Sequence, residues 1–440
     1  MGRPHTCLLV AVLSMHWACT EKATTDSEAE TDDTNDTNDT DDTNDTNDTN
    51  DTDDTDDTDD TDDTDIHDLV IRLRWVQGHD DATWEQAKAG LWWSMTNLGA
   101  VPPTNDAALT IIEADSDQVT FDLDLGSLGW STDIETRVSR GVAPMQQSDE
   151  MASQGSVDLG RFLTRTVYEP WLYYFITDAC PTLDGYRDTH LEQDPLGFAV
   201  TDSLLVEGHR LITFNGDPSI TDEMAFLASE GDGSLIDGTF AAHEYETVDV
   251  LPNGQQRFAI YSDEGALIPT TNPEYSPAGQ PGKCMWCHEA ELHRAMTSNE
   301  TVDPYISYTA FNIQIEEMQT IIDDTRSTLE TSVDFDEYHV HTWGEQIVES
   351  FLTPPIARVA REWSMSVEEV EAVVADLSME TKEHEEYPEW GEVLVRADVD
   401  AAAVAILGWT ALPTLNSARE LEAGTAEWAE LAAELTPCLP

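Results

Sequence analysis

The sequence predicts an α+β fold with a strand and helix layer at the front, a β-rich middle and an all-α C-terminal region. At the front, apolar residues alternate with a more polar set over residues 69–74, which is typical of a strand. Residues 157–262 are rich in aromatic and β-branched residues and in turn signals, which indicates further strands. Beyond residue 281 the spacing of apolar residues is helical.

Residues 1–19 have the pattern of a bacterial lipoprotein signal peptide. Arg3 gives a basic start, residues 7–15 form a short apolar run, and Ala18 stands directly before Cys19. The run is too short to span a bilayer, which takes about 20 apolar residues. We therefore expect Cys19 to be lipidated and to anchor an extracytoplasmic protein to a bacterial membrane, which we take to be the outer one.

An ordinary secretory signal is the alternative for this segment. His16 stands where lipoprotein signals usually have leucine, and Trp17 is bulky where small residues are usual. Both interpretations place the folded body outside the cytoplasm.

Residues 20–65 are predicted to be a disordered acidic tether. From residue 26 the chain cycles through Asp-Asp-Thr and Asn-Asp-Thr, and residues 26–65 hold 21 of the 89 acidic residues and no lysine or arginine. Such a segment repels itself and buries no apolar surface, which indicates an extended stalk. The alternative is a weak calcium sink, although the repeat lacks the glycine and fixed loop of a defined calcium site. With a net charge of −69, the chain is also a poor partner for nucleic acid.

A helix and two strands complete the predicted front layer. Thr83 precedes an apolar stripe with spacings of three and four residues, and the pattern ends at Gly99. The members of the stripe are Trp84, Ala87, Leu91, Met95 and Leu98. Strands are predicted at residues 109–113 and 119–125.

The middle of the chain is predicted to be mostly strand and to complete an α+β body over residues 66–268. The strands include residues 204–214 and 257–261, with a turn at 263–265. The aromatic run at residues 171–175 could line a cofactor pocket, but core packing is the more common role of such a run.

Residues 269–440 are predicted to form a helical region. A proline-rich loop covers residues 269–281, and Ser366 and Glu369 have the spacing of a capping box. Later helices are predicted at residues 401–409 and 417–435.

The six cysteines fall into three groups. Two lie in the signal segment, Cys284 and Cys287 form a CxxC pair, and Cys180 and Cys438 are left over. In an oxidising compartment two leftover cysteines usually form a bridge, so we expect a disulfide between Cys180 and Cys438.

The chemistry of the chain is predicted to lie in the sequence Cys284-Met285-Trp286-Cys287-His288. This is the CxxCH signature of covalent haem c attachment, in which two thiols add to the porphyrin vinyl groups and the next imidazole binds the iron. Cys284 and Cys287 are thus candidate attachment residues, and His288 is the candidate axial ligand.

Two alternatives stay open for this motif. Cys284 and Cys287 could hold zinc together with His288 and His293, although no second CxxC is present. The two thiols could also form a disulfide. His288 and His293 are five residues apart and do not match the four-residue spacing of a zinc-protease helix.

A sixth iron ligand would have to come from elsewhere in the chain. Met318, His339 and His341 are far enough along the chain to fold back to the other side of the haem, and Met296 is a marginal candidate because it follows the motif closely. Met318 also fits an apolar helical stripe with Ile315, so core packing is its favoured role. An empty sixth position would favour catalysis or small-ligand binding over electron transfer, and whether the protein is an enzyme stays open.

The motif resembles that of monohaem c-type cytochromes, and two wider resemblances accompany it. The order of a strand at residues 257–261, a turn and CxxCH weakly resembles the cytochrome P460 type. Residues 158–162, 283–289 and 360–366 are similar to a family of uncharacterised bacterial lipoproteins, which implies a shared fold and no known activity.

These observations predict a membrane-anchored protein with one haem c that transfers electrons to a redox partner protein or performs small-molecule redox chemistry. The alternative is a non-redox surface module whose CxxC pair is structural. The chain contains no P-loop, no dinucleotide-binding glycine fingerprint and no nucleophile elbow, which argues against a nucleotide enzyme or a hydrolase.

Overall fold

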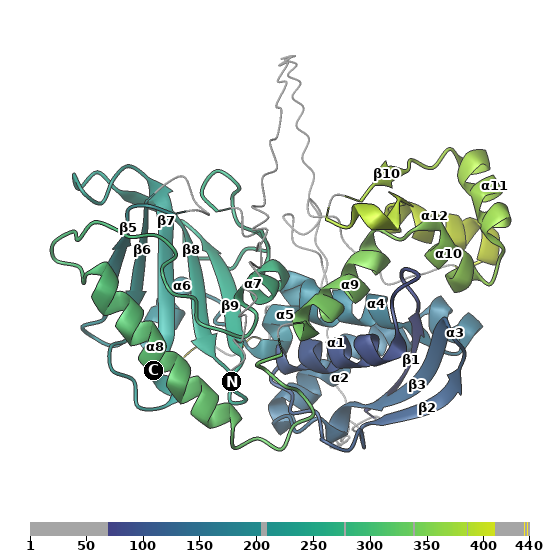
Figure 1. Ribbon diagram of the computed structural model, residues 1–440, viewed down its shortest axis with the longest axis horizontal. Coiled ribbons are helices and arrows are strands. Elements are labelled where there is room, and N and C mark those ends of the chain that lie inside the picture. The colour runs from purple at the N-terminus through teal and green to yellow at the C-terminus, as the bar shows by residue number, and fades with distance from the viewer. Residues whose placement is uncertain are drawn as a thin grey trace, which may run out of the picture. The chain divides into compact units, whose positions relative to one another are not determined.

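The computed structural model describes residues 69–203, 209–276, 279–337, 339–384 and 386–409, together with Leu435 and Cys438 (Figure 1). These residues belong to one compact unit, Asp68–Pro440. The signal segment with Cys19, the acidic tether and most of the helix predicted at 417–435 lie outside the described residues.

The front of the chain forms a four-stranded sheet with helices, as predicted. Its elements are β1 (Val70–Val76), α1 (Trp84–Thr96), β2 (Leu109–Ala114), β3 (Gln118–Asp124), α2 (Thr132–Gln146), α3 (Asp149–Gln154) and β4 (Val157–Asp158). The strand order is β2-β3-β1-β4, with β1 antiparallel to β3 and parallel to β4. Thr83 begins α1 with a capping box that includes Gln86, because each side chain satisfies a backbone N–H of the other residue.

The strand prediction is wrong for the start of the middle stretch, which is helical. It contains α4 (Leu159–Leu163), a π-helical turn (Thr164–Tyr168), α5 (Pro170–Thr177) and α6 (Leu183–His190). The aromatic run at 171–175 lies in α5 and is buried throughout, so its predicted core role is confirmed. A helix buried on all sides shows no amphipathic period, so its pattern is indistinguishable from that of a buried strand. Pro170 at the first helical position is the local signal for the helix.

A five-stranded antiparallel sheet forms the β-rich middle. Its strands are β5 (Leu196–Val200), β6 (His209–Phe214), β7 (Ala225–Asp232), β8 (Ala241–Val250) and β9 (Gln256–Ser262), in sequential order. On one face Phe198 and Phe214 pack against Phe311 of α8 (Tyr308–Arg326). On the other face the Tyr186 hydroxyl of α6 lies 3.1 Å from the carbonyl oxygens of two strands.

The C-terminal part is helical, as predicted, apart from one two-stranded ribbon. Besides α8, its elements are α7 (Pro281–His288), α9 (Val340–Leu352), α10 (Ile356–Trp363), α11 (Val367–Leu377), β10 (Lys382–Glu383), β11 (Glu392–Val393) and α12 (Arg396–Leu407). Three-residue 3-10 turns lie at Leu125–Ser127, Thr221–Glu223 and Pro388–Trp390. The capping box of Ser366 and Glu369 is present at the start of α11. The helix predicted at 401–409 begins five residues earlier, at Arg396.

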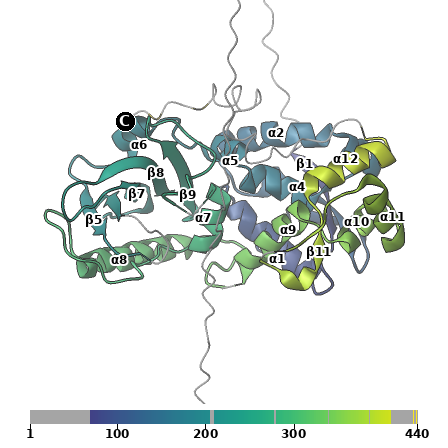
Figure 2. The ribbon, with the colours of Figure 1, turned by 90° about the horizontal axis from the view of Figure 1, so that it is seen from above.

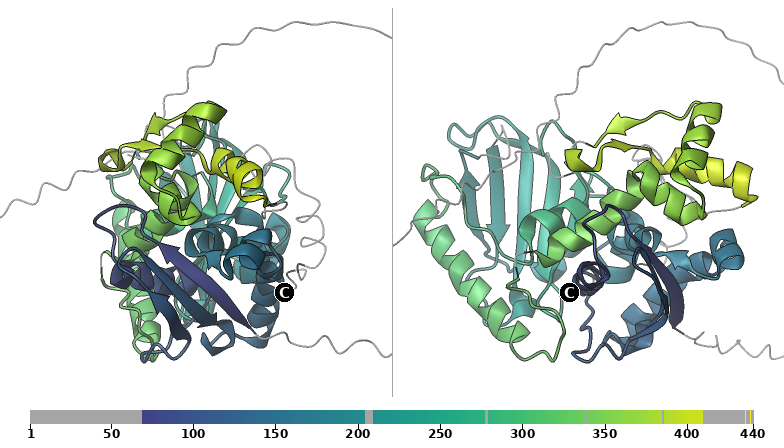
Figure 3. Two further views of the ribbon diagram at one scale, coloured as in Figure 1. Left: turned by 90° about the vertical axis from the view of Figure 1, so that its right-hand side faces the viewer. Right: turned by 45° about the vertical axis from the view of Figure 1, so that its right-hand side comes forward.

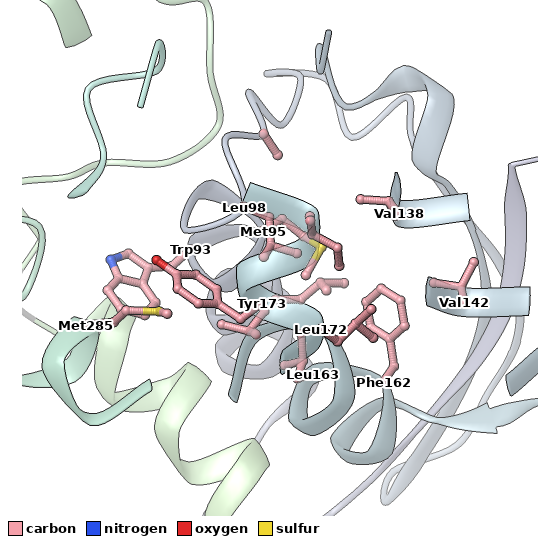
Figure 4. Close-up of a cluster of buried hydrophobic side chains, with 14 of the residues drawn as sticks. Trp93, Met95, Leu98, Val138, Val142, Phe162, Leu163, Leu172, Tyr173 and Met285 are labelled. Carbon is pink, nitrogen blue, oxygen red and sulfur yellow. The ribbon is translucent and has the colours of Figure 1, made fainter. Parts of the chain in front are cut away.

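The largest apolar core crosses the boundary expected near residue 268. Figure 4 shows buried members of this core from α1, α2, α4, α5 and α7, with Leu98 from the turn after α1: Trp93, Met95, Leu98, Val138, Val142, Phe162, Leu163, Leu172, Tyr173 and Met285. Met285 comes from α7, so the helix that carries CxxCH is anchored in the same core as the front layer. None of the helices among the described residues is sufficiently long and apolar to cross a membrane.

Helices α1 and α9 cross with almost no space between their backbones. A Cβ atom on Gly90 would lie 2.5 Å from the backbone nitrogen of Gly344. Only glycine permits this approach, which brings α9 alongside α1. Figure 3 shows α9 and the helices that follow it beside the front sheet.

Candidate functional site

Helix α7 carries the CxxCH motif and lies beside β9 (Figure 2). Pro281 occupies its first turn, and Glu289 ends it in the left-handed conformation with φ of 50°. A Cβ atom on Gly282 would lie 2.5 Å from the Tyr168 ring, so glycine is needed for α7 to pack this closely. Trp286 stacks on the same ring with centroids 5.0 Å apart.

The motif residues divide between two sides of α7. Met285 and Trp286 are 1% and 8% exposed and pack into the core. Cys284, Cys287 and His288 are three and four residues apart and therefore share the other side of the helix. Cys284 and His288 are half-buried, and Cys287 is exposed. The helix thus presents both sulfurs and the imidazole on one face.

Cys284 and Cys287 are both thiols in the structure. Burial, together with the negative charge of Glu246, raises the pKa of Cys284 well above its ordinary value. The Cys284 sulfur is therefore held as the neutral thiol.

The His288 ring is positioned by its neighbours. Its centroid lies 4.9 Å from that of His293, with the rings stacked, and 5.2 Å from that of Phe258. Nδ1 can donate to the Glu291 carbonyl oxygen at 3.3 Å, which leaves Nε2 for a metal. Burial, and then the charge of His293, lower the pKa of His288 to about 4. The imidazole is therefore neutral near pH 7, as metal ligation requires.

The four candidates for a sixth ligand lie on different elements. Met318 is 1% exposed and packs in the apolar core under α8, as its helical spacing indicates. Met296 is 54% exposed and lies after α7. His339 is exposed at the start of α9. His341 is 7% exposed, and its Nε2 lies 3.2 Å from Oε1 of Glu289, the residue that follows His288.

A groove of about 590 Å³ runs between the segment after the motif and α8. Two hydrogen bonds fix that segment, because the Leu292 N–H donates to Gln319 Oε1 at 2.8 Å and the Ala295 N–H donates to Asn312 Oδ1 at 2.9 Å. His293 and Met296 line the groove. Of the predicted ligand candidates, Met296 and His341 thus lie on segments that adjoin α7.

Sequence reasoning missed a charged row on the sheet beside the motif. Arg210, Glu230 and Glu244 are direct cross-strand partners on β6, β7 and β8. Glu246 lies two residues beyond Glu244 and therefore on the same face. The alternation of Glu244 and Glu246 in a strand was the available signal, but the pairing with Glu230 depends on the sheet register.

The leftover cysteines Cys180 and Cys438 are joined in a disulfide, the pairing expected from the cysteine count. Two groups of three possible metal-ligand side chains, with ligand atoms within 4.8 Å of one another, occur among the described residues. One is Cys180, His190 and Cys438, in which both sulfurs belong to the disulfide. The other is Glu230, Glu244 and Glu246.

Comparisons of the chain with models of protein families, with curated proteins and with solved structures find no match. The chemistry of the site is therefore inferred from its own residues.

Proposed function

We propose that this protein is an extracytoplasmic lipoprotein that holds one covalent haem c at Cys284, Cys287 and His288 and transfers electrons. The observation that carries the proposal is the face of α7, which presents two thiols and a neutral imidazole while Met285 and Trp286 hold the helix in the core. These donors fit haem c, since attachment takes two thiols and a metal-binding imidazole in this order. When bound, haem c supplies a one-electron redox couple.

Three residues of the chain would hold the haem, two through covalent bonds and one through the iron. Cys284 and Cys287 would form the thioether links. His288 would bind through Nε2, with its ring orientation set by the Glu291 carbonyl and by the stacked His293 ring. A sixth ligand from Met296 or His341 would favour electron transfer, whereas an open position would favour small-molecule redox chemistry.

The same proposal places the protein at a membrane through a lipid on Cys19, with residues 20–65 as a spacer between the membrane and the folded body. A redox partner protein is the expected partner. The net charge of −69 makes nucleic acid an unfavourable one.

The second candidate is a non-redox surface module in which the motif holds zinc. It is favoured by one observation, the His293 ring that stacks on the His288 ring with centroids 4.9 Å apart, which places a second imidazole beside that of the motif. Zinc is bound by this combination of sulfur and nitrogen ligands.

The test is to express the full chain in cells with a c-type maturation system and to measure haem and zinc per chain. We expect one haem that resists acid-acetone extraction in the wild type and becomes extractable or absent in the double variant Cys284→Ala with Cys287→Ala, which can form no thioether link. His288→Ala should abolish the Soret band or shift it to a ligand-loss spectrum, whereas His293→Ala should keep the covalent haem, because the thioether links do not involve His293. One zinc and no haem in the wild type, or an oxidised Cys284–Cys287 pair, would reject the redox function.

A further inference from the structure

The carboxylate corner, defined as Glu230, Glu244 and Glu246, lies on the face of the five-stranded sheet that also carries Arg210. One carboxylate oxygen from each of the three residues lies within 4.8 Å of the others. The arrangement follows from the sheet, because Glu230 and Glu244 are direct cross-strand partners and Glu246 is next on the same face.

The charges of this corner are only partly balanced. Glu230 and Glu244 are 0% and 2% exposed, so water screens them poorly. Arg210 forms an ion pair with Glu230 and lies 3.9 Å from Glu246 Oε2. One guanidinium thus faces three carboxylates. With all three carboxylates ionised, the corner has an excess of about two negative charges.

Three carboxylate oxygens of the corner also lack hydrogen-bond partners. Glu244 Oε2 accepts from the Asn272 N–H at 2.6 Å, and Glu246 Oε1 accepts from the Ser276 hydroxyl at 2.7 Å. Glu244 Oε1 and both oxygens of Glu230 are buried without a hydrogen bond, although Glu230 Oε1 forms the ion pair with Arg210. A buried acceptor that lacks a donor is unfavourable, so these oxygens point to a ligand that neither the sheet nor the loop supplies.

We propose that Glu230, Glu244 and Glu246 bind one divalent cation of the hard, oxygen-preferring class, with Ca²⁺ as the expected ion. Calcium–oxygen distances are about 2.3–2.6 Å, so two oxygens on one ion can be at most about 5 Å apart. The three glutamate oxygens lie within 4.8 Å of one another, so all three can contact one calcium ion. A divalent ion together with Arg210 would neutralise all three carboxylates, and Ca²⁺ tolerates irregular ligand geometry better than Mg²⁺.

Protonation of the glutamates is the alternative way to remove this excess negative charge. Burial raises the pKa of Glu244 to about 7 and that of Glu230 well above its ordinary value. An ion that binds here must displace these protons, so calcium binding should weaken as the pH falls below about 7 and should release protons. The Cys284 thiol of α7 faces Glu246 and Arg210, but none of the proposed calcium ligands belongs to the CxxCH motif.

The test compares calcium binding by full-length variants after removal of metal with a chelator and desalting. Equilibrium dialysis with radioactive Ca²⁺ in excess Mg²⁺ is made on the wild type, Glu244→Gln and Glu230→Gln. Glu274→Gln is the matched control, because Glu274 is exposed in the neighbouring loop. The acidic tether is identical in all chains, so its weak binding cancels in the comparison.

We expect wild type and Glu274→Gln to bind one more Ca²⁺ per chain than the corner variants, at least tenfold more tightly than the tether does. Calcium should raise the melting temperature of these two proteins and leave those of the corner variants unchanged. If Glu230→Gln and Glu244→Gln both fail to fold, Glu246→Gln is compared with the wild type instead, since Glu246 is partly exposed. Equal calcium binding in all folded variants would overturn the proposal. So would a wild type that binds no extra Ca²⁺ while Glu244→Gln is more stable above pH 7, because the corner would then be shown to hold protons only.

Discussion

Arg161 of α4 donates from its two Nη atoms to the two carboxylate oxygens of Asp400 in α12, at 3.0 and 2.9 Å. Its Nε donates to Glu150 at 2.7 Å, and the guanidinium lies over the Phe351 ring, 5.0 Å from its centroid. Arg358 and Arg396 lie over the same ring at 5.3 and 3.9 Å. Three buried arginines and their carboxylates thus join the front layer to the C-terminal helices.

Replacing Arg161 with alanine should destabilise the folded unit by about 3–5 kcal/mol, because Glu150 and Asp400 would lose their shared cation and keep only the longer ion pairs with Arg74 and Arg396, at 3.4 and 3.5 Å. Urea unfolding followed by circular dichroism measures the change. Arg72→Ala is the control, since its ion pair with Asp122 is partly exposed and should contribute less than about 1 kcal/mol. Equal losses in the two variants would show that the buried network does not stabilise the fold.

Stability should fall in acid through Glu362. Burial alone would raise the pKa of Glu362, but Arg396 and Arg358 lower it to about 2 from an ordinary value of 4.5. A depressed pKa stabilises the fold fully above the unfolded value, and that contribution is lost as the pH falls from about 4.5 toward 2. The urea midpoint measured between pH 6 and 2 should therefore drop more steeply in the wild type than in Glu362→Gln. Parallel curves for the two proteins would contradict the assignment.

The Cys180–Cys438 disulfide should clamp the end of the chain to the body. It closes a loop with a sequence separation of 258, so its removal in Cys180→Ser should cost about 2–5 kcal/mol. Non-reducing peptide mapping should recover one peptide that contains both cysteines. Recovery of both cysteines as alkylated thiols would refute the pairing in solution.

The lipid anchor can be tested apart from the fold. Cys19→Ser should release the protein from membranes into a soluble fraction or leave it as the unprocessed precursor, because no other residue of the signal segment can take the lipid in the lipoprotein pattern. Fractionation with a mass measurement of the N-terminus gives the answer. Normal processing and continued membrane binding of the variant would remove the lipoprotein interpretation.

The sequence alone determined those features that depend on neighbours along the chain. The alternation at residues 69–74 and the capped stripe after Thr83 correspond to β1 and α1. Only the first part of each element has an exposed face, since residues 73–76 and 90–96 are buried throughout. The CxxCH signature of Cys284, Cys287 and His288 defined the candidate site, and in α7 these residues share one side of the helix because they are three and four residues apart.

Only the tertiary structure decided the features that depend on distant partners. Burial on all sides removed the period that would have identified α5 as a helix. The carboxylate corner exists because the register of β7 and β8 sets Glu230 opposite Glu244. Arg161 and Asp400 are 239 residues apart, and each has the pattern of an ordinary surface charge until the fold buries it. Opposite charges attract one another over a few ångströms of space, whatever their separation along the chain. These contacts therefore have no local signature in the sequence.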